Sequence, residues 1–366
     1  TPIRNLFMRR GPTLMSVLLE EIRDDSDSRC SGAFNALLMK RLVTAPHNIL
    51  DRGNVLEDFM LFLKEAVSVE RDESDPWFLQ LCSELVVHVY CKDPVPSCDL
   101  EGVQDSKGII FVREWSENSM QCLMQHGSGI VSCFILNANY DTSGDLRMCR
   151  VNLLEALLSS GVSVKDTDLD LMGVLRVMVP MASTAQNASQ LRSRALAAAF
   201  DLISLWSGNC DDKPIRLVAY SKRDKSNSMS SNEELFLQNP DWIPILLQVL
   251  DTLDDSNDTI RKQAVIGMNY IIPLIPESIL TNFVQKFLTL AWLLCNDKED
   301  NNVNIDDMDS LLRSVAVLDA DLVEKEAREQ LNKVKAATSD NKNKNEMENF
   351  ESFRQFISDI ISHCSL

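Results

Sequence analysis

Histidine and cysteine are the side chains that most often supply catalysis or metal binding, and here they match no recognised site. The four histidines are scattered, and no phosphate-binding glycine loop, Gly-x-Ser-x-Gly elbow or His-Glu-x-x-His motif occurs. One loose grouping of thiols and imidazoles lacks the paired Cys-x-x-Cys spacing of a zinc site, and buried helix cysteines explain it better. We therefore predict no catalytic residue, no cofactor and no metal. That grouping comprises Cys82, His88, Cys91, Cys98, Cys122 and His126.

Aspartate clusters could hold calcium, but two of them fit a solvated surface better. The clusters at 24–27 and 306–309 contain three aspartates each, and the second lacks the central glycine and final glutamate of an EF-hand loop. The third cluster, at 254–258, has a structural explanation. It closes one predicted helix and offers N-cap oxygens to the next, and we expect Asn187 and Asn257 to cap helices as well.

A basic segment stands out in an otherwise acidic region. Residues 210–232 hold five Lys and Arg against three Asp, with Lys222, Arg223 and Lys225 close together. These three cations are candidate contacts for an acidic partner or for DNA phosphates. The alternative is a serine-rich, disordered excursion without a defined function, or one that accepts phosphorylation.

Aromatic residues gather on one predicted helix near the C-terminus. Phe350, Phe353 and Phe356 share an apolar face with three isoleucines within residues 349–366. We expect this helix either to cap the preceding helices or to anchor another protein, with the three phenylalanines as candidate partner contacts.

The elements that would carry these residues are helices, and one helical pattern occurs three times. With Arg147, Arg192 and Arg261 set in register, apolar residues coincide at offsets −1, +4, +7, +10 and +11. Those offsets lie along one face of an α-helix, so each copy must bury its stripe against neighbouring helices. The coincident residues are Leu146, Val151, Leu154, Leu157 and Leu158; Leu191, Leu196, Ala199, Leu202 and Ile203; and Ile260, Val265, Met268, Ile271 and Ile272.

The spacing of these arginines indicates a repeat. The first two are 45 residues apart, and the last two are 69 apart, an excess of 24 that residues 210–232 nearly account for. A period of about 45 lies within the roughly 40–47 residues of two-helix repeats. We predict an all-α fold, a HEAT/ARM-like α-solenoid of stacked helical hairpins, with 210–232 as an insertion between repeats.

Composition and charge narrow the class of protein. The chain has 366 residues, 12 glycines and a formal charge of −18. Because residues 1–50 carry seven Lys and Arg against five Asp and Glu, the remainder holds −20, which disfavours broad DNA binding. No run of about 18 uninterrupted apolar residues predicts a membrane span. The cysteine spacing shows no disulfide framework, so we expect an intracellular protein, nuclear or cytoplasmic.

Two stretches resemble a known family. Residues 242–269 resemble a HEAT repeat, with a helix, an Asp-rich turn and a second helix that has an arginine near its start. The stretch from Arg194 to Leu202 (RALAAAFDL), followed by Gly208, resembles the R-x-L-x-A-x-F-D-L…G stretch of condensin's G-type HEAT subunit, and the likeness extends over 145–295. The resemblance implies a subunit that grips a kleisin chain and helps hold DNA.

These observations predict a scaffold rather than an enzyme. We expect a helical array over 1–337, irregular over 1–140 and clearer over 145–295, then a linker at 338–348 and a terminal amphipathic helix at 349–366. The expected function is a non-catalytic scaffold or adaptor in a multiprotein complex that binds extended partner segments, kleisin-like or other, and no small molecule or membrane. Condensin-like chromosome organisation is the leading specific form. A karyopherin-like transport receptor and a regulatory subunit that positions an enzyme stay open as alternatives.

Overall fold

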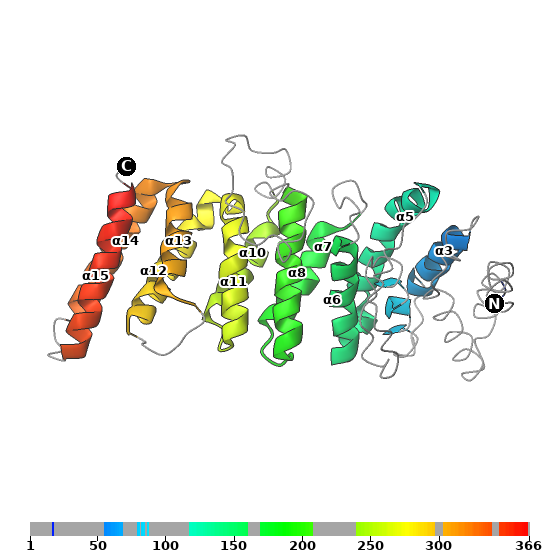
Figure 1. The fold of residues 1–366 in the computed structure, drawn as a ribbon, viewed down its shortest axis with the longest axis horizontal. Helices are drawn as coiled ribbons and strands as arrows, with labels where there is room; N and C mark the ends of the chain where they lie inside the picture. The colour runs from blue at the N-terminus through cyan, green and yellow to red at the C-terminus, as the bar shows by residue number, and fades with distance from the viewer. Residues whose placement is uncertain are drawn as a thin grey trace, which may run out of the picture. The chain divides into compact units, whose positions relative to one another are not determined.

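The described part of the chain is all-α, as the sequence predicts. The computed structural model describes residues 17, 55–68, 79–80, 82–84, 86–87, 117–159, 169–207, 239–296, 303–338 and 344–364. Every regular element within these ranges is an α-helix or a short 3-10 helix (Figure 1). The chain divides into two compact units, and the boundary between them falls inside helix α7, after Val177. Each unit is described by itself.

Unit 1 is built on three helices that contact one another in chain order. Helix α3 (Val55–Ser68) packs on α5 (Glu117–Leu136), and α5 packs on α6 (Gly144–Ser159). Helical residues between 79 and 87, the short helix η1 (Ala138–Asp141) and the first part of α7 (Leu171–Ser183) complete it. Helix α3 buries one apolar stripe, which comprises Val55, Leu56, Phe59, Met60 and Leu63. Helix α6 is buried on most sides, because every residue from Cys149 to Leu158 except Asn152 and Glu155 is buried.

Helix α5 corrects one sequence prediction. Apolar periodicity in the sequence predicts two helices, at about 112–124 and 130–138, with a break between them. Within the described residues a single helix, Glu117–Leu136, runs through this break. Glycine weakens a helix by about 1 kcal/mol, which packing easily overrides. Gly129 is tolerated within α5 because that helix is held between α3 and α6.

Unit 2 contains the remaining helices. They are α8 (Ser189–Ser207), α10 (Trp242–Asp251), η4 (Thr252–Asp254), α11 (Asp258–Ile271), η5 (Ile272–Leu274), α12 (Glu277–Asn296), α13 (Ile305–Ala316), α14 (Ala320–Thr338) and α15 (Lys344–Cys364). Helices α8 and α11 lie side by side (Figure 1). Their approach is close at Gly267, where an added Cβ would lie 2.0 Å from the ring of Phe200. Small residues on α8, among them Ala195 and Ala199, are fully buried.

Helix α12 is the core helix of the C-terminal part of unit 2. Its 20 residues are apolar enough, by length and composition alone, to cross a membrane. Packing explains the composition, because α12 contacts α10, α13, α14 and α15. The residues that it buries are Ile279, Leu280, Phe283, Val284, Phe287, Leu288 and Ala291.

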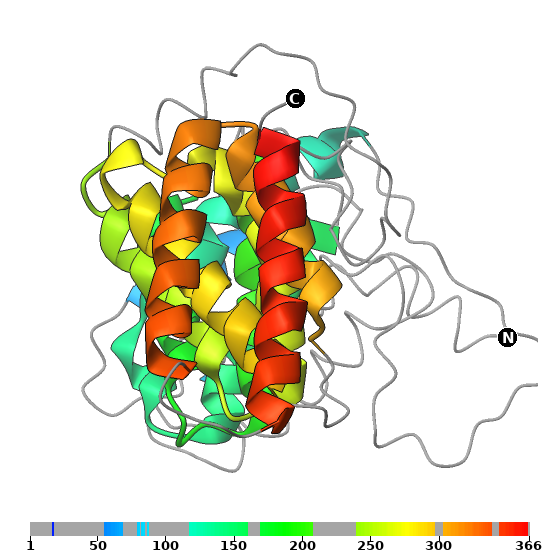
Figure 2. The ribbon, with the colours of Figure 1, turned by 90° about the vertical axis from the view of Figure 1, so that its left-hand side faces the viewer.

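The last two helices form an antiparallel pair (Figure 2). Helix α14 extends to Thr338 and α15 already begins at Lys344, so residues 344–348 of the predicted linker are helical. The outward residues of α15 are polar from Glu348 onward, whereas Phe353, Ile357 and Ile360 are buried. A helix with one buried stripe and a polar outer face is suited to cover a core.

Candidate functional site

The three arginines that define the repeat lie at equivalent places, in the first turns of α6, α8 and α11. Arg147 donates from Nε (3.3 Å) and from a guanidinium NH2 group (3.0 Å) to the carbonyl of Asp141. Arg261 donates to the carbonyl of Asp255 at 2.6 Å. The accepting carbonyl lies six residues before the arginine in both cases. Each of these two arginines is therefore hydrogen bonded to the turn that leads into its own helix. Two of the three copies therefore share this hydrogen bond as well as the apolar pattern, whereas Arg192 bonds other groups.

Capping residues repeat in the same register. Ser143 and Asn257 each lie four residues before an aligned arginine. The Ser143 hydroxyl accepts from the backbone N–H of Leu146 at 3.2 Å, and the Asn257 side chain accepts from the N–H of Thr259 at 3.0 Å. These bonds satisfy N–H groups that a helix start leaves without intrahelical partners. The predicted capping role of Asn257 is confirmed.

Asn187 is hydrogen bonded to the end of the helix that precedes it. Its side-chain amide donates to the carbonyl of Met181 at 2.9 Å, in the last turn of α7. The side chain is buried, and the bond closes the turn between α7 and α8.

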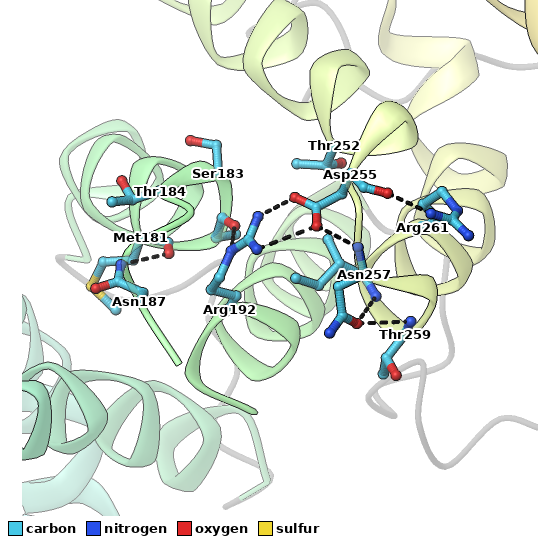
Figure 3. A network of polar contacts seen from close by, with 12 residues as sticks. Met181, Ser183, Thr184, Asn187, Arg192, Thr252, Asp255, Asn257, Thr259 and Arg261 are labelled. Atoms are coloured by element: carbon cyan, nitrogen blue, oxygen red, sulfur yellow. Dashed lines mark hydrogen bonds and ion pairs between the residues drawn. The ribbon is translucent and has the colours of Figure 1, made fainter. Parts of the chain in front are cut away.

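Arg192 links two turns that are far apart in sequence (Figure 3). Its Nε donates to the carbonyl of Ala182 at 2.8 Å, at the end of α7. Its two terminal nitrogens bond both carboxylate oxygens of Asp255, one at 3.2 Å and the other in a short ion pair. The Arg192 side chain is 6% exposed and that of Asp255 11%, so the pair is largely removed from water. Bidentate pairing of this kind fixes geometry as well as charge.

Asp255 is the centre of this network. Besides Arg192, its carboxylate accepts from the backbone N–H of Asn257 at 2.9 Å, while its carbonyl accepts from Arg261. One aspartate thus joins α8, the turn after η4 and the start of α11. Its neighbour Asp254 pairs with Lys286 on α12. The charged groups of this network are bonded to one another. They therefore hold the helices and turns in place, and the arrangement indicates a structural role.

Asp141 occupies the corresponding position in unit 1. Its carboxylate pairs with Arg150 at 2.5 Å, and Arg150 also donates to the carbonyl of Asn137 at 2.6 Å. The guanidinium carbon of this buried arginine lies 6.0 Å from the ring centre of Tyr140. The Tyr140 hydroxyl donates to the carbonyl of Leu79 at 2.9 Å and lies 2.8 Å from the Ser83 hydroxyl. Burial raises the pKa of Tyr140 far above its ordinary value, so the ring stays neutral.

The predicted basic contacts belong to a segment that the structure does not describe. Lys222, Arg223 and Lys225 lie outside the described residues, within 208–238. That prediction therefore remains a sequence-based one.

The predicted aromatic contacts face into unit 2. Phe353 is fully buried and meets Trp292 of α12 edge to face, with ring centres 5.4 Å apart. Phe356 stacks on Phe353 at 6.2 Å and is 9% exposed, whereas Phe350 is half-buried. The face of α15 that sequence offered as an anchor thus packs on α12, and only Phe350 retains appreciable exposure.

The structure describes part of the groupings that sequence offered as possible metal ligands. No three His, Cys, Asp or Glu side chains come together to hold a metal within the described ranges. Cys82 is buried and Cys122 half-buried, while His88, Cys91 and Cys98 lie outside those ranges. In the acidic cluster at the start of α13 (Ile305–Ala316), Asp307 forms a capping box with Asn304, and Asp309 pairs with Arg313.

The sequence analysis did not predict the groups that accept hydrogen bonds from the arginines. It assigned the 254–258 cluster to closing and capping helices, and it did not single out Asp141 or Arg150. A signal was present, because an aspartate precedes Arg147 and Arg261 by six residues in both repeats.

Comparisons with known proteins place this chain in no family. No protein-family model matches it, and no curated protein matches it either. Among solved structures, it is similar to the crystal structure of an engineered protein from the Northeast Structural Genomics Consortium, at 10% identity. The alignment covers 95% of this chain and 68% of that one, with a TM-score of 0.44.

Proposed function

We propose that this chain is a non-catalytic scaffold subunit, a HEAT-like α-solenoid whose stacked repeats bind extended segments of partner proteins. One observation carries the proposal: Arg147 and Arg261 make the same bond to a carbonyl six residues earlier. Equal bonds at equal register favour a structural repeat over a coincidence of apolar residues. Stacked repeats generate long binding surfaces, and such arrays act through partners.

The Arg192–Asp255 pair supports the repeat-to-repeat part of this proposal. It ties the start of α8 to the turn before α11, across 63 residues of sequence. In an array, each repeat is stabilised through its interface with the next one. A buried pair at one such interface would keep the curvature of unit 2 fixed, as a surface that receives an extended peptide requires.

A condensin-like role in chromosome organisation is the specific form that we favour. Its support is the resemblance of residues 145–295, within which Phe200 of the RALAAAFDL stretch packs against Gly267 of α11. The test is binding of fluorescently labelled kleisin peptides to the purified chain, together with affinity purification and mass spectrometry from cells. Saturable peptide binding and recovery of SMC-complex subunits are expected. Absence of both would exclude this form.

The same affinity purification distinguishes two alternative roles from the condensin-like one. A karyopherin-like receptor is favoured by the charge of −18, which suits basic cargo, and it predicts recovery of Ran. A regulatory subunit predicts recovery of one enzyme in constant stoichiometry. DNA contact is tested by salt-dependent binding that is lost when Lys222, Arg223 and Lys225 are neutralised.

A further inference from the structure

One end of unit 2 exposes an apolar pair on a well-ordered turn. Val317 is 58% exposed and Leu318 48%, in the turn between α13 and α14. The backbone of this turn is hydrogen bonded throughout. The N–H of Val317 donates to the Arg313 carbonyl at 3.2 Å, and the N–H groups of Leu318 and Asp319 donate to the Val315 carbonyl at 2.8 and 3.0 Å. The two side chains are therefore presented by fixed backbone rather than by a loose loop.

The last turns of α15 lie beside this turn (Figure 2). Helix α15 contacts both α13 and α14. The hydrogen bond to Asp309 and, to a lesser degree, the charge of Asp359 on α15 raise the pKa of Arg313 in the last turn of α13. The end of α13, the start of α14 and the end of α15 are therefore neighbours, and residues of all three can contribute to one surface with the apolar pair.

The charge around the pair is negative. Asp319, Asp321 and Asp359 are exposed, and neither Asp319 nor Asp321 is ion-paired within the described part of the chain. The cations of this region are paired with other carboxylates: Arg313 with Asp309, Arg328 with Glu324, and Lys325 with Glu326 and Glu329. The rim therefore keeps a net negative charge. A carboxylate near a helix N-terminus stabilises that helix, which explains Asp319 and Asp321 in part, but not the exposed apolar pair between the helices.

We propose that this turn is a docking surface for a partner protein segment in which apolar residues are flanked by Lys and Arg. Val317 and Leu318 would supply the desolvated centre, and Asp319, Asp321 and Asp359 the complementary rim. Interfaces are built in this way, with an apolar centre and a polar rim that steers association. The proposal deepens the scaffold function and rests on it. The acidic rim disfavours a membrane as occupant, because anionic lipids would be repelled.

The test uses three sets of fluorescein-labelled 12-residue peptides with two central apolar residues. The flanks are Lys/Arg in the first set, Ser in the second and Glu in the third, and binding is measured by anisotropy to the full chain. The first set is expected to bind best, with affinity falling as salt rises. Equal binding of the Ser-flanked set would overturn the charge complementarity.

Matched variants test whether the peptides bind at the Val317/Leu318 turn. Val317→Ser with Leu318→Ser is expected to weaken peptide binding about tenfold, as loss of a central apolar contact does. Asp321→Asn with Asp359→Asn is expected to weaken it about threefold at low salt. Leu293→Ser is the control, because Leu293 is 52% exposed on α12 in the same unit. Circular dichroism verifies that each variant keeps its helical content.

Two outcomes would overturn the proposal. One is peptide binding unchanged in the Val317/Leu318 variant. The other is a concentration-dependent dimer that this variant abolishes, since the pair would then be covered by a second copy. Failure of the kleisin and co-purification tests would remove the condensin-like role and leave these measurements intact, so the two proposals can fail separately.

Discussion

The guanidinium of Arg192 on α8 is paired with both carboxylate oxygens of Asp255, which lies 63 residues later in the turn before α11. Neither side chain is more than 11% exposed. Removal of one partner from a buried pair leaves the other charge without compensation, which costs far more than the intact pair contributes.

Arg192→Ala is therefore expected to lower the free energy of unfolding of unit 2 by about 3–5 kcal/mol. Thermal unfolding followed by circular dichroism measures it. Lys262→Ala is the matched control, because Lys262 is an exposed cation on α11 and its loss should change stability by less than about 0.5 kcal/mol. A double variant with Asp255→Asn should recover part of the loss, and strict additivity of the two changes would show that the pair is not coupled.

Gly267→Ala is expected to destabilise unit 2 by about 1–3 kcal/mol, as overpacking does. Alanine normally favours a helix by about 1 kcal/mol over glycine, but here its Cβ would lie 2.0 Å from Phe200. Such a distance requires α8 and α11 to move apart, so the steric cost outweighs the propensity.

The control for that substitution is Gly129→Ala in α5, where nothing lies within 4 Å of the added Cβ. It should stabilise unit 1 by up to about 1 kcal/mol. Chemical denaturation of both variants gives the comparison. A stabilising Gly267→Ala would mean that α8 and α11 do not approach this closely.

Local features of the fold were predictable because their causes are local. Apolar offsets placed α6, α8 and α11 to within a few residues, and an Asx cap marked the start of α11 at Asn257. The close contact of Phe200 with Gly267 and the pairing of Arg192 with Asp255 were not predictable in this way. Each depends on how two helices separated by the 208–238 segment approach one another, and that approach leaves no periodic signal in the sequence.

Phe353→Ala is expected to lower the stability of unit 2 by about 3–5 kcal/mol, because it removes a fully buried ring from its contact with Trp292. Phe350→Ala should cost much less, since Phe350 is half-buried. Urea denaturation of the two variants distinguishes the sequence alternatives for this helix. Unchanged stability of Phe353→Ala, with loss of a partner, would indicate an anchor rather than a cap.

Cys295 gives a prediction about pH, because burial raises the pKa of its thiol to about 11. In the unfolded chain a thiol has a pKa of about 8.5, so the unfolded state loses its proton first as pH rises. The stability that Cys295 contributes is therefore fully present below about pH 8.5 and is lost as pH rises through about 11. Cys295→Ala removes this contribution. The unfolding midpoints of wild type and variant are measured under reducing conditions from pH 7.5 to 11. As pH rises, the midpoint of the wild type should fall relative to that of the variant. A difference that is constant across this range would show that the Cys295 thiol titrates alike in the folded and unfolded chains.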